Sequence, residues 1–256
     1  MNLGLKTKKE MELVIDIGNT YTKIAVFKHN QLLHTEQYQH TDTAVINNIL
    51  GSYPINKAII SSVKKDKEEW QGILAEKVEL IYFNAAMTSG ITNHYLTPKT
   101  LGLDRLAAVI GAYHLYQGKN NMVIDGGTCI TYDWVDAAGN YFGGSISPGL
   151  NMRYKALNNY TAGLPLISAD ESFDNKSGND TQSAIRSGVQ NGIKYELTGF
   201  IESYKIKQEE LNIVLTGGDS IFFDRLLKNS IFAPCIKMEP YLVLKGLNAA
   251  IQTNND

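Results

Sequence analysis

The stretch that decides the fold occurs twice, first as Val14-Ile15-Asp16-Ile17-Gly18-Asn19-Thr20-Tyr21-Thr22-Lys23 and again as Val123-Ile124-Asp125-Gly126-Gly127-Thr128-Cys129-Ile130-Thr131. Each copy places an aspartate at the end of an apolar strand, then glycine in a tight turn, then a second strand. The two aspartates are about 110 residues apart, which is roughly one domain length. A single copy would be interpreted as an ordinary β-turn, but two copies at the head of matching patterns predict a duplicated fold.

The elements expected after each hairpin follow one order. In the first half we expect strands at 12–17, 21–27, 31–38, 57–63 and 78–83, with helices at 43–53 and 66–77. In the second half we expect strands at 121–125, 129–135, 141–146, 211–215 and near 236, with helices at 181–205, 219–228 (capped by Asp219) and 242–252. The pattern predicts an α/β protein of two similar βββαβα halves, 11–118 and 119–256, with a ligand cleft between them. Residues 1–10 are expected to be a disordered or non-native extension before Met11.

Composition and charge narrow the class of protein. Hydrophobic residues make up 43% of the chain and charged residues 20%, which is typical of a soluble globular protein. The net charge of −2 predicts no nucleic-acid partner, and no apolar run approaches the roughly 18 residues of a membrane helix. The two cysteines, Cys129 and Cys235, have no metal-type spacing and fit a reducing compartment, so we expect a cytoplasmic protein without a membrane partner.

The chemistry of the hairpins indicates a nucleotide phosphate site. Glycine permits a positive φ and brings backbone N–H groups close to phosphate oxygens. An aspartate cannot bind a phosphate directly, so its expected role is to hold a cation or the waters around Mg²⁺. Gly217-Gly218 at the end of a third strand strengthens this interpretation. The candidate ATP-binding residues of the first hairpin are Asp16, Ile17, Gly18, Asn19, Thr20, Tyr21, Thr22 and Lys23.

A candidate acceptor site follows at Gly102-Leu103-Asp104-Arg105, which opens a predicted helix running to about Gln117. Its apolar stripe consists of Leu103, Leu106, Ile110 and Tyr113. Asp104 lies off that stripe in the first turn, where the helix dipole favours its ionised form. An ionised carboxylate there could accept the proton of an alcohol that attacks the γ-phosphate of ATP. The alternatives are an Asp–Arg surface pair or an aspartate that only stabilises the helix start.

Taken in order, the motifs resemble the superfamily of acetate kinase, sugar kinases, heat-shock ATPases and actin, and within it the type III pantothenate kinase family. The resemblance runs from residue 12 to about 250, with one departure at Cys129, where the family usually has alanine. The motifs that carry it are Asp16–Thr20, Gly102–Arg105, Asp125–Thr128, Gly143–Gly149, Thr181-x-x-Ala184-Ile185-x-x-Gly188 and Thr216–Asp219.

The resemblance implies an actin-like ATPase fold of two ribonuclease-H-like halves, with the nucleotide in the cleft between them. It also implies a homodimer that uses ATP with Mg²⁺ to convert pantothenate to 4′-phosphopantothenate, the first step of coenzyme A synthesis. Asp104 would be the catalytic base, Asp125 would bind a monovalent cation (K⁺ or NH₄⁺), and Thr128 would contact ATP. The implied substrate-binding residues are Tyr95, Gly102, Leu103, Asp104, Arg105 and Thr181, the last reaching over from the partner subunit.

Several alternatives stay open at this point. The chain could be a kinase of another small alcohol, a hydrolase, or a non-catalytic nucleotide-binding protein that acts as a transcription accessory factor. Loss of Asp16, Asp104 or Asp125 would favour the non-catalytic role, and all three are present. Thr181 has a structural alternative as the N-cap of the long helix. Arg105 suits the carboxylate of pantothenate, because a guanidinium can form a two-pronged pair with it.

Overall fold

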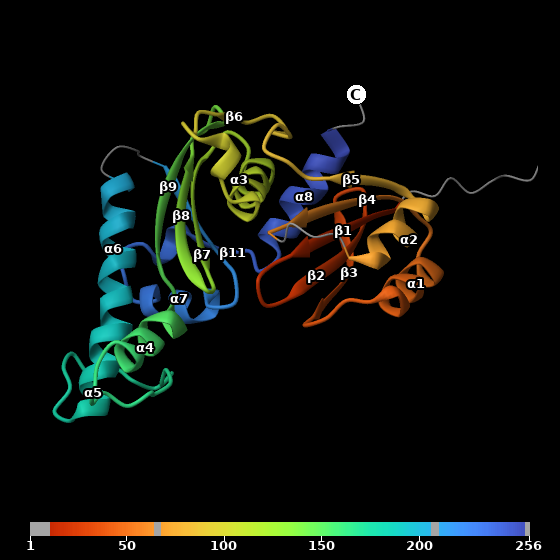
Figure 1. Ribbon diagram of the computed structural model, residues 1–256. Coiled ribbons are helices and arrows are strands. Elements are labelled where there is room, and N and C mark those ends of the chain that lie inside the picture. Colours follow the sequence, from red (N-terminus) through yellow and green to blue (C-terminus); the bar gives the residue numbers. More distant parts are fainter. Residues whose placement is uncertain (1–10, 64–67, 206–209, 254–256) are drawn as a thin grey trace, which may run out of the picture. The chain divides into compact units, whose positions relative to one another are not determined.

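The computed structural model describes residues 11–63, 68–205 and 210–253, so the predicted extension 1–10 lies outside the described part. The described residues form two compact units: unit 1 comprises those up to 115 and those from 242 onward, and unit 2 comprises those between 116 and 241. Each unit contains one mixed sheet with helices, which confirms the predicted α/β class (Figure 1). Within the described ranges, no helix is long and apolar enough to cross a membrane.

Unit 1 is built on a sheet with the strand order β3-β2-β1-β4-β5. The three strands β1, β2 and β3 form an antiparallel meander, whereas β4 and β5 join β1 in parallel. The elements of unit 1 are β1 (Met11–Ile17), β2 (Thr22–Lys28), β3 (Gln31–Tyr38), α1 (Thr43–Ser52), β4 (Ile55–Ser62), α2 (Glu69–Lys77), β5 (Glu79–Tyr82), β6 (Thr92–Asn93), a 3-10 turn (Pro98–Thr100), α3 (Leu103–Leu115) and α8 (Leu242–Thr253).

Unit 2 repeats this topology, with its strands in the order β9-β8-β7-β10-β11. Again the first three strands are antiparallel and the last two are parallel to the strand that carries the aspartate. The duplication predicted from the two hairpins is therefore confirmed strand by strand. The elements of unit 2 are β7 (Asn120–Gly126), β8 (Cys129–Val135), β9 (Asn140–Pro148), α4 (Leu150–Asn159), α5 (Thr181–Arg186), a π-helical turn (Ser187–Asn191), α6 (Gly192–Lys205), β10 (Leu211–Thr216), α7 (Ser220–Leu227), a 3-10 turn (Ala233–Cys235) and β11 (Ile236–Met238).

The sheet of unit 1 is covered on both faces, which explains why its central strands read as nearly continuous apolar runs. One face carries Leu13, Ile15 and Ile17 of β1 and packs against Trp70 and Leu74 of α2, with α1 beside it. The opposite face is covered by α8, which contacts β1, β2 and β4 (Figure 1). Because side chains alternate along a strand, Asp16 lies on the face opposite Ile15 and Ile17.

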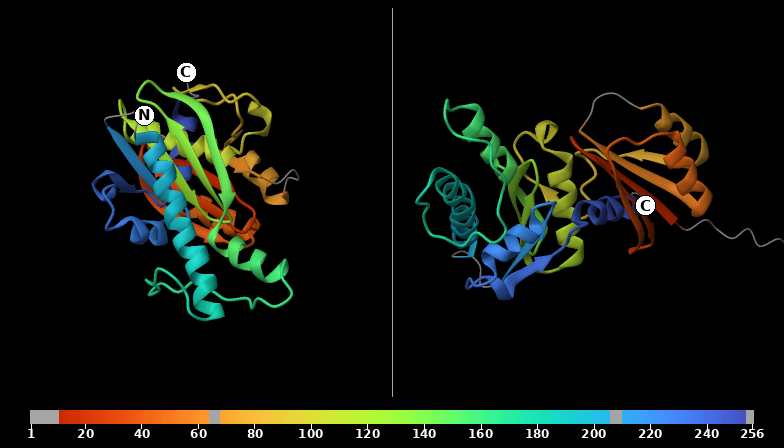
Figure 2. Two further views of the ribbon diagram at one scale, coloured as in Figure 1. Left: turned by 90° about the vertical axis from the view of Figure 1, so that its left-hand side faces the viewer. Right: turned by 90° about the horizontal axis from the view of Figure 1, so that it is seen from below.

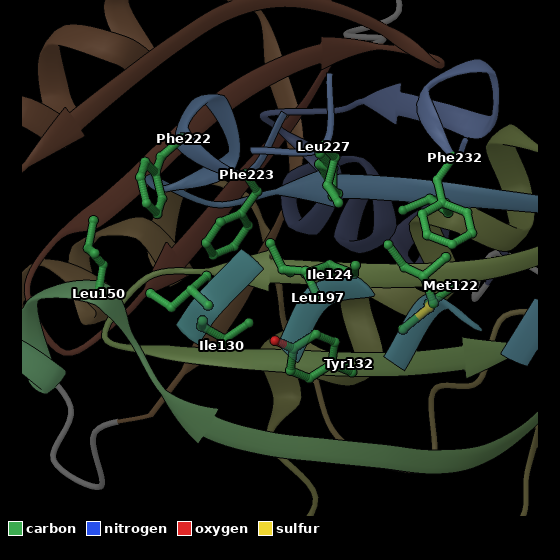
Figure 3. Close-up of a cluster of buried hydrophobic side chains, with 14 of the residues drawn as sticks. Met122, Ile124, Ile130, Tyr132, Leu150, Leu197, Phe222, Phe223, Leu227 and Phe232 are labelled. Atoms are coloured by element: carbon green, nitrogen blue, oxygen red, sulfur yellow. The ribbon is translucent and has the colours of Figure 1, made fainter. Parts of the chain in front are cut away.

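The core of unit 2 lies between its sheet and the helices α4, α6 and α7. Figure 3 shows part of it, with Met122, Ile124 and Tyr132 of the sheet near Leu197 of α6 and Phe223 of α7. The helix α6 runs across this face of the sheet (Figure 2). The ring of Tyr132 stacks on Phe200 at a centroid distance of 4.1 Å, which fixes where its hydroxyl points. This packing anchors β8 directly behind the second hairpin.

Four details differ from the sequence-based expectations. The predicted division after residue 118 assigns the last helix to the second half, whereas α8 packs within unit 1 against α3. Helix α4 was not expected; three of its ten residues are asparagines, which are weak helix formers. The long helix predicted at 181–205 is interrupted by the π-helical turn at Ser187–Asn191. Helix α3 is buried from Arg105 to Ala112 on all its faces, rather than along one apolar stripe.

Candidate active site

The first hairpin connects β1 to β2 in unit 1. The N–H of Gly18 donates to the carbonyl of Tyr21 at 3.0 Å, which closes a tight turn with Asn19 and Thr20 exposed at its tip. Asp16 lies directly across the ladder from Lys23, which is half-buried. The side chains of Ile17 and Thr22 are buried, so these two candidates would face a phosphate through their backbone groups.

The second hairpin connects β7 to β8 in unit 2 and is supported from two directions. The N–H of Gly149 donates to the carbonyl of Thr128 at 3.1 Å, and the N–H of Asp219 donates to the carbonyl of Gly126 at 3.0 Å. Gly127 and Thr128 are exposed at the tip, as Asn19 and Thr20 are in the first hairpin. The turn is therefore held by its neighbours while its tip stays accessible to a ligand.

The two aspartates occupy equivalent positions. Asp16 lies beside Ser61 of β4, and Asp125 lies beside Thr216 of β10, in the corresponding parallel pair of each sheet. Both neighbours are hydroxyl residues with 1% of their surface exposed. The duplication therefore includes the polar surroundings of each carboxylate. Two unrelated β-turns would not be expected to share these surroundings.

The hairpin glycines work differently from the expectation that they adopt a positive φ. Neither Gly18 nor Gly127 has one, whereas Gly217 at the end of β10 does, with φ of 83°. A Cβ at Gly217 would lie 2.2 Å from Oδ1 of Asp125 and 2.3 Å from the carbonyl oxygen of Gly126. Gly217 therefore allows the Gly217-Gly218 turn to lie tightly against the second hairpin.

The acceptor-side residues come together at the start of α3 in unit 1. Oδ1 of Asp104 accepts the N–H of Arg105 at 2.8 Å, so its side chain folds back over the first turn of the helix. A Cβ at Gly102 would lie 2.5 Å from that oxygen, so a larger residue there would displace the Asp104 carboxylate from this position. The guanidinium carbon of Arg105 lies 5.7 Å from the ring centre of Tyr95, within cation–π distance. Arg105 is only 6% exposed, and Leu103 is half-buried.

Thr181 is exposed at the first position of α5, and its expected structural alternative as the N-cap is wrong. The N-cap is Asp180, whose Oδ1 accepts the N–H groups of Gln182 and Ser183 at 2.9 and 3.1 Å. The hydroxyl of Ser183 completes a capping box. The spacing Asp180-x-x-Ser183 is the sequence signal that could have located this cap. Thr181 itself is exposed beside this cap.

Asp219 occupies the N-cap position of α7, as expected, but within the described ranges its side chain makes no capping hydrogen bond. Burial raises the pKa of its carboxyl above the usual range. Ionisation of the Asp219 carboxyl, which directly follows Gly217-Gly218, is therefore less favourable than it would be in water.

The residues around Asp125 fit a bound cation. Its Oδ1 and the carbonyl of Gly126 converge on the space that a side chain at Gly217 would fill. Carboxylate and carbonyl oxygens are the ligands of hard cations. In the described ranges no three His, Cys, Asp or Glu side chains gather as a metal cluster. A cation here would thus rely on one carboxylate, backbone carbonyls and the phosphates themselves.

Sequence reasoning missed the contacts behind the second hairpin. Arg153 of α4 and Glu196 of α6 pair at 2.6 Å between Nη2 and Oε2. Arg153 also donates from Nε to the carbonyl of Pro148 at 2.8 Å, next to Gly149. The two residues are far apart in the chain and follow no local pattern, so no sequence signal indicated this pair.

The fold and the duplicated hairpins place the protein in the actin-like ATPase fold class. Solved structures support the fold alone, since their identities are low. A putative Baf family transcriptional activator from Campylobacter jejuni has a TM-score of 0.59 at 20% identity, covering 95% of this chain and 98% of that one. A putative N-acetylmannosamine kinase from Listeria monocytogenes has a TM-score of 0.57 at 12% identity, covering 96% of this chain and all of that one (100%).

Sequence comparison identifies the family. A family model described as Type III pantothenate kinase matches residues 12–203. A type III pantothenate kinase of Bacteroides fragilis is 42% identical over 249 residues, covering 96% of this chain and 99% of the relative. That of Christiangramia forsetii is 42% identical over 246 residues, covering 95% and 99%. The chain belongs to the type III pantothenate kinase family, which confirms the resemblance drawn from the motifs.

Proposed function

We propose that this protein transfers the γ-phosphoryl group of ATP to the primary hydroxyl of pantothenate. The product is 4′-phosphopantothenate, and the reaction is the first step of coenzyme A synthesis. The observation that carries the proposal is the start of α3, where Asp104 and Arg105 lie side by side with Tyr95 against the guanidinium. This arrangement occurs in a chain 42% identical to type III pantothenate kinases over 96% of its length.

Asp104 is the proposed catalytic base. Its carboxylate is fixed by the N–H of Arg105 and sits in the first turn of α3, where the helix dipole stabilises negative charge. A fixed carboxylate can take the proton of the pantothenate hydroxyl as that oxygen attacks phosphorus. Gly102 supports this role, because a side chain there would collide with Oδ1 of Asp104.

Arg105 is the proposed partner of the pantothenate carboxylate, and Tyr95 stacks on its guanidinium. A guanidinium can offer two parallel N–H donors to a carboxylate, which fixes both position and orientation. Leu103 lies beside them in the first turn of the helix. Thr181, exposed at the start of α5, is proposed to contact the substrate from the partner subunit.

The two hairpins are proposed to bind ATP. Asn19 and Thr20 in the first and Thr128 in the second present exposed donors at their tips, and Lys23 supplies a positive charge. Asp125 would hold a monovalent cation, K⁺ or NH₄⁺, and Asp16 would lie near Mg²⁺ that enters with ATP. Such cations, when bound, offset the charge of the phosphates. The proposed nucleotide position in a cleft between the halves follows from the resemblance and stays a prediction.

A homodimer is proposed because the family resemblance makes Thr181 act across subunits. Large exposed apolar side chains in unit 2 support an interface there: Phe142 is 63% exposed, Ile146 is 61% exposed and Tyr195 is 65% exposed. Exposed apolar side chains of this size are typical of surfaces that become buried on association. The cytoplasmic location remains a prediction from the cysteine usage.

The deciding experiment incubates the purified protein with ATP, Mg²⁺, K⁺ and pantothenate and follows 4′-phosphopantothenate by mass spectrometry. We expect product from the wild type, little from Asp104→Asn, and a decrease when K⁺ is replaced by Na⁺. A panel of sugars and small alcohols separates pantothenate from other acceptors. Absence of product despite bound ATP would contradict the pantothenate assignment and favour another acceptor or the non-catalytic alternative.

A further inference from the structure

Four side chains of unit 2 converge behind the second hairpin, and the proposed reaction steps do not use them. They are Tyr132 of β8, Ser147 of β9, Arg153 of α4 and Glu196 of α6, and we call them the Glu196 cluster. Oε1 of Glu196 accepts the hydroxyl of Tyr132 at 2.7 Å and that of Ser147 at 2.5 Å. Oε2 of Glu196 accepts Nη2 of Arg153 at 2.6 Å. One carboxylate thus ties together two strands and two helices.

Arg153 extends this cluster to the junction where β9 ends and α4 begins. Its Nε donates to the carbonyl of Pro148 at 2.8 Å, and its backbone N–H donates to the carbonyl of Gly149 at 3.0 Å. Its Nη2 also reaches the hydroxyl of Ser147 at 3.2 Å. The guanidinium and the backbone of one residue therefore hold three successive residues, 147 to 149.

The junction in turn holds the second hairpin. The N–H of Gly149 donates to the carbonyl of Thr128, and the backbones approach so closely that a Cβ at Gly149 would lie 2.1 Å from the carbonyl oxygen of Gly127. Cys129 pairs with Pro148 in the ladder, so strand pairing and this hydrogen bond act on the same turn. A shift of residues 148–149 would move Gly127 and Thr128 with it, because no space separates them.

We infer that Glu196 and Arg153 are positioning residues for ATP binding. Their ion pair, which we call the clamp, holds Pro148 and Gly149 in place, and these two residues fix the position of the Gly127–Thr128 tip. The inference rests on the proposed role of this hairpin in ATP binding. Neither side chain needs to touch ATP, since the connection runs through Pro148, Gly149 and the carbonyl of Thr128. Phosphate-binding backbone groups act through exact placement, so a small displacement of the tip weakens binding.

The charges of the clamp persist at neutral pH. Burial opposes the ionisation of Glu196, but the hydrogen bonds from Ser147, Arg153 and Tyr132 outweigh it and hold the pKa of this carboxyl below its usual value. The side chains of Arg153 and Glu196 are 19% and 23% exposed, so water screens the pair only in part. The carboxylate and guanidinium therefore remain a charged, hydrogen-bonded pair under the conditions of the reaction.

The test compares Glu196→Gln with Glu202→Gln, which removes the same charge from an exposed position on the same helix. A third variant, Arg153→Lys, keeps the positive charge but cannot reach Glu196, Ser147 and Pro148 together. Thr128→Ala tests the hairpin itself. For each protein we would measure the KM for ATP, the KM for pantothenate, kcat, the Kd of a fluorescent ATP analogue and the thermal unfolding temperature.

We expect Glu196→Gln and Arg153→Lys to raise the KM and Kd for nucleotide about tenfold, with the KM for pantothenate unchanged and Glu202→Gln behaving as wild type. An unchanged nucleotide Kd in both folded variants would overturn the inference, and so would a loss of activity that only follows the folded fraction. If Thr128→Ala also leaves nucleotide binding unchanged, the proposed contact of the Thr128 side chain with ATP fails as well. If Thr128→Ala weakens it while the clamp variants do not, only the clamp is contradicted.

Discussion

Gly111 of α3 and Gly246 of α8 meet where the two helices of unit 1 cross, and neither position has room for a side chain. A Cβ at Gly246 would lie 1.8 Å from the carbonyl oxygen of Ala107, and one at Gly111 would lie 2.6 Å from the carbonyl oxygen of Leu242. Both obstacles are backbone atoms, which cannot rotate away. The close crossing fixes α3, and α3 begins with the proposed base Asp104.

Gly246→Ala should therefore destabilise the protein by about 3 kcal/mol, because the helices must separate to admit the methyl group. The measurement is the midpoint of urea unfolding. The matched control is Gly72→Ala in α2, where an added Cβ meets nothing within 4 Å. That change should stabilise by about 0.5–1 kcal/mol, since alanine is the better helix former. Equal effects of the two substitutions would argue against the tight crossing.

Asp104→Asn should lower kcat by about 10²- to 10⁴-fold while leaving the fold intact. The amide oxygen of asparagine can still accept the N–H of Arg105, so the first turn of α3 keeps its hydrogen bond. Only the ability to take a proton is lost. Steady-state kinetics and circular dichroism check the two halves of this expectation, and a variant that retains most of its kcat would rule out Asp104 as the base.

Arg105→Lys should raise the KM for pantothenate about tenfold, which corresponds to roughly 1.4 kcal/mol of lost binding. Lysine keeps the charge but offers no planar fork for a carboxylate and stacks less well on Tyr95. The KM for ATP should stay near that of the wild type. As a second probe, pantothenyl alcohol, which lacks the carboxylate, should discriminate little between wild type and variant. Equal KM changes for pantothenate and for the alcohol would contradict a carboxylate contact.

Glu12→Gln should raise the unfolding temperature at pH 7. Glu12 is 9% exposed on β1, and burial raises the pKa of its carboxyl. Because the folded state binds this proton more tightly than the unfolded chain, ionisation of Glu12 costs stability as the pH rises above the unfolded pKa. The advantage of glutamine should disappear near pH 3, where glutamate is protonated in both states. An advantage that does not depend on pH would exclude this cause.

The strands and both hairpins could be predicted because their signals are local. Asp16 and Asp125 each end an apolar run before a glycine-containing turn, and the paired strands follow within a few residues. The position of Asp104 in the first turn of α3 was predicted for the same reason. Structures held by hydrogen bonds between residues close in sequence have a recognisable sequence pattern, so they can be predicted before the fold is known.

Contacts between distant residues could not be predicted in this way. The pair of Arg153 and Glu196 forms only after α4 and α6 pack on the sheet. The sequence around each residue does not distinguish it from an ordinary charged residue on the surface. Likewise, the apolar face of α8 shows that the helix is buried but not in which unit. The stripe expected for α3 was too narrow because small residues, Ala107, Ala108 and Gly111, also pack closely.

The return of α8 to unit 1 has a consequence for the order in which the protein folds during synthesis. Residues 116–241 form a continuous compact unit, whereas unit 1 is assembled from segments made before and after it. The face of the first sheet that α8 covers stays open until the ribosome has translated all of unit 2. Domains usually mature in the order of their synthesis. Here unit 2, which is translated second, can fold first. Unit 1, which carries Asp104, can complete its fold only after α8 has been translated, and until then Val14 and Ile59 on its strands stay uncovered.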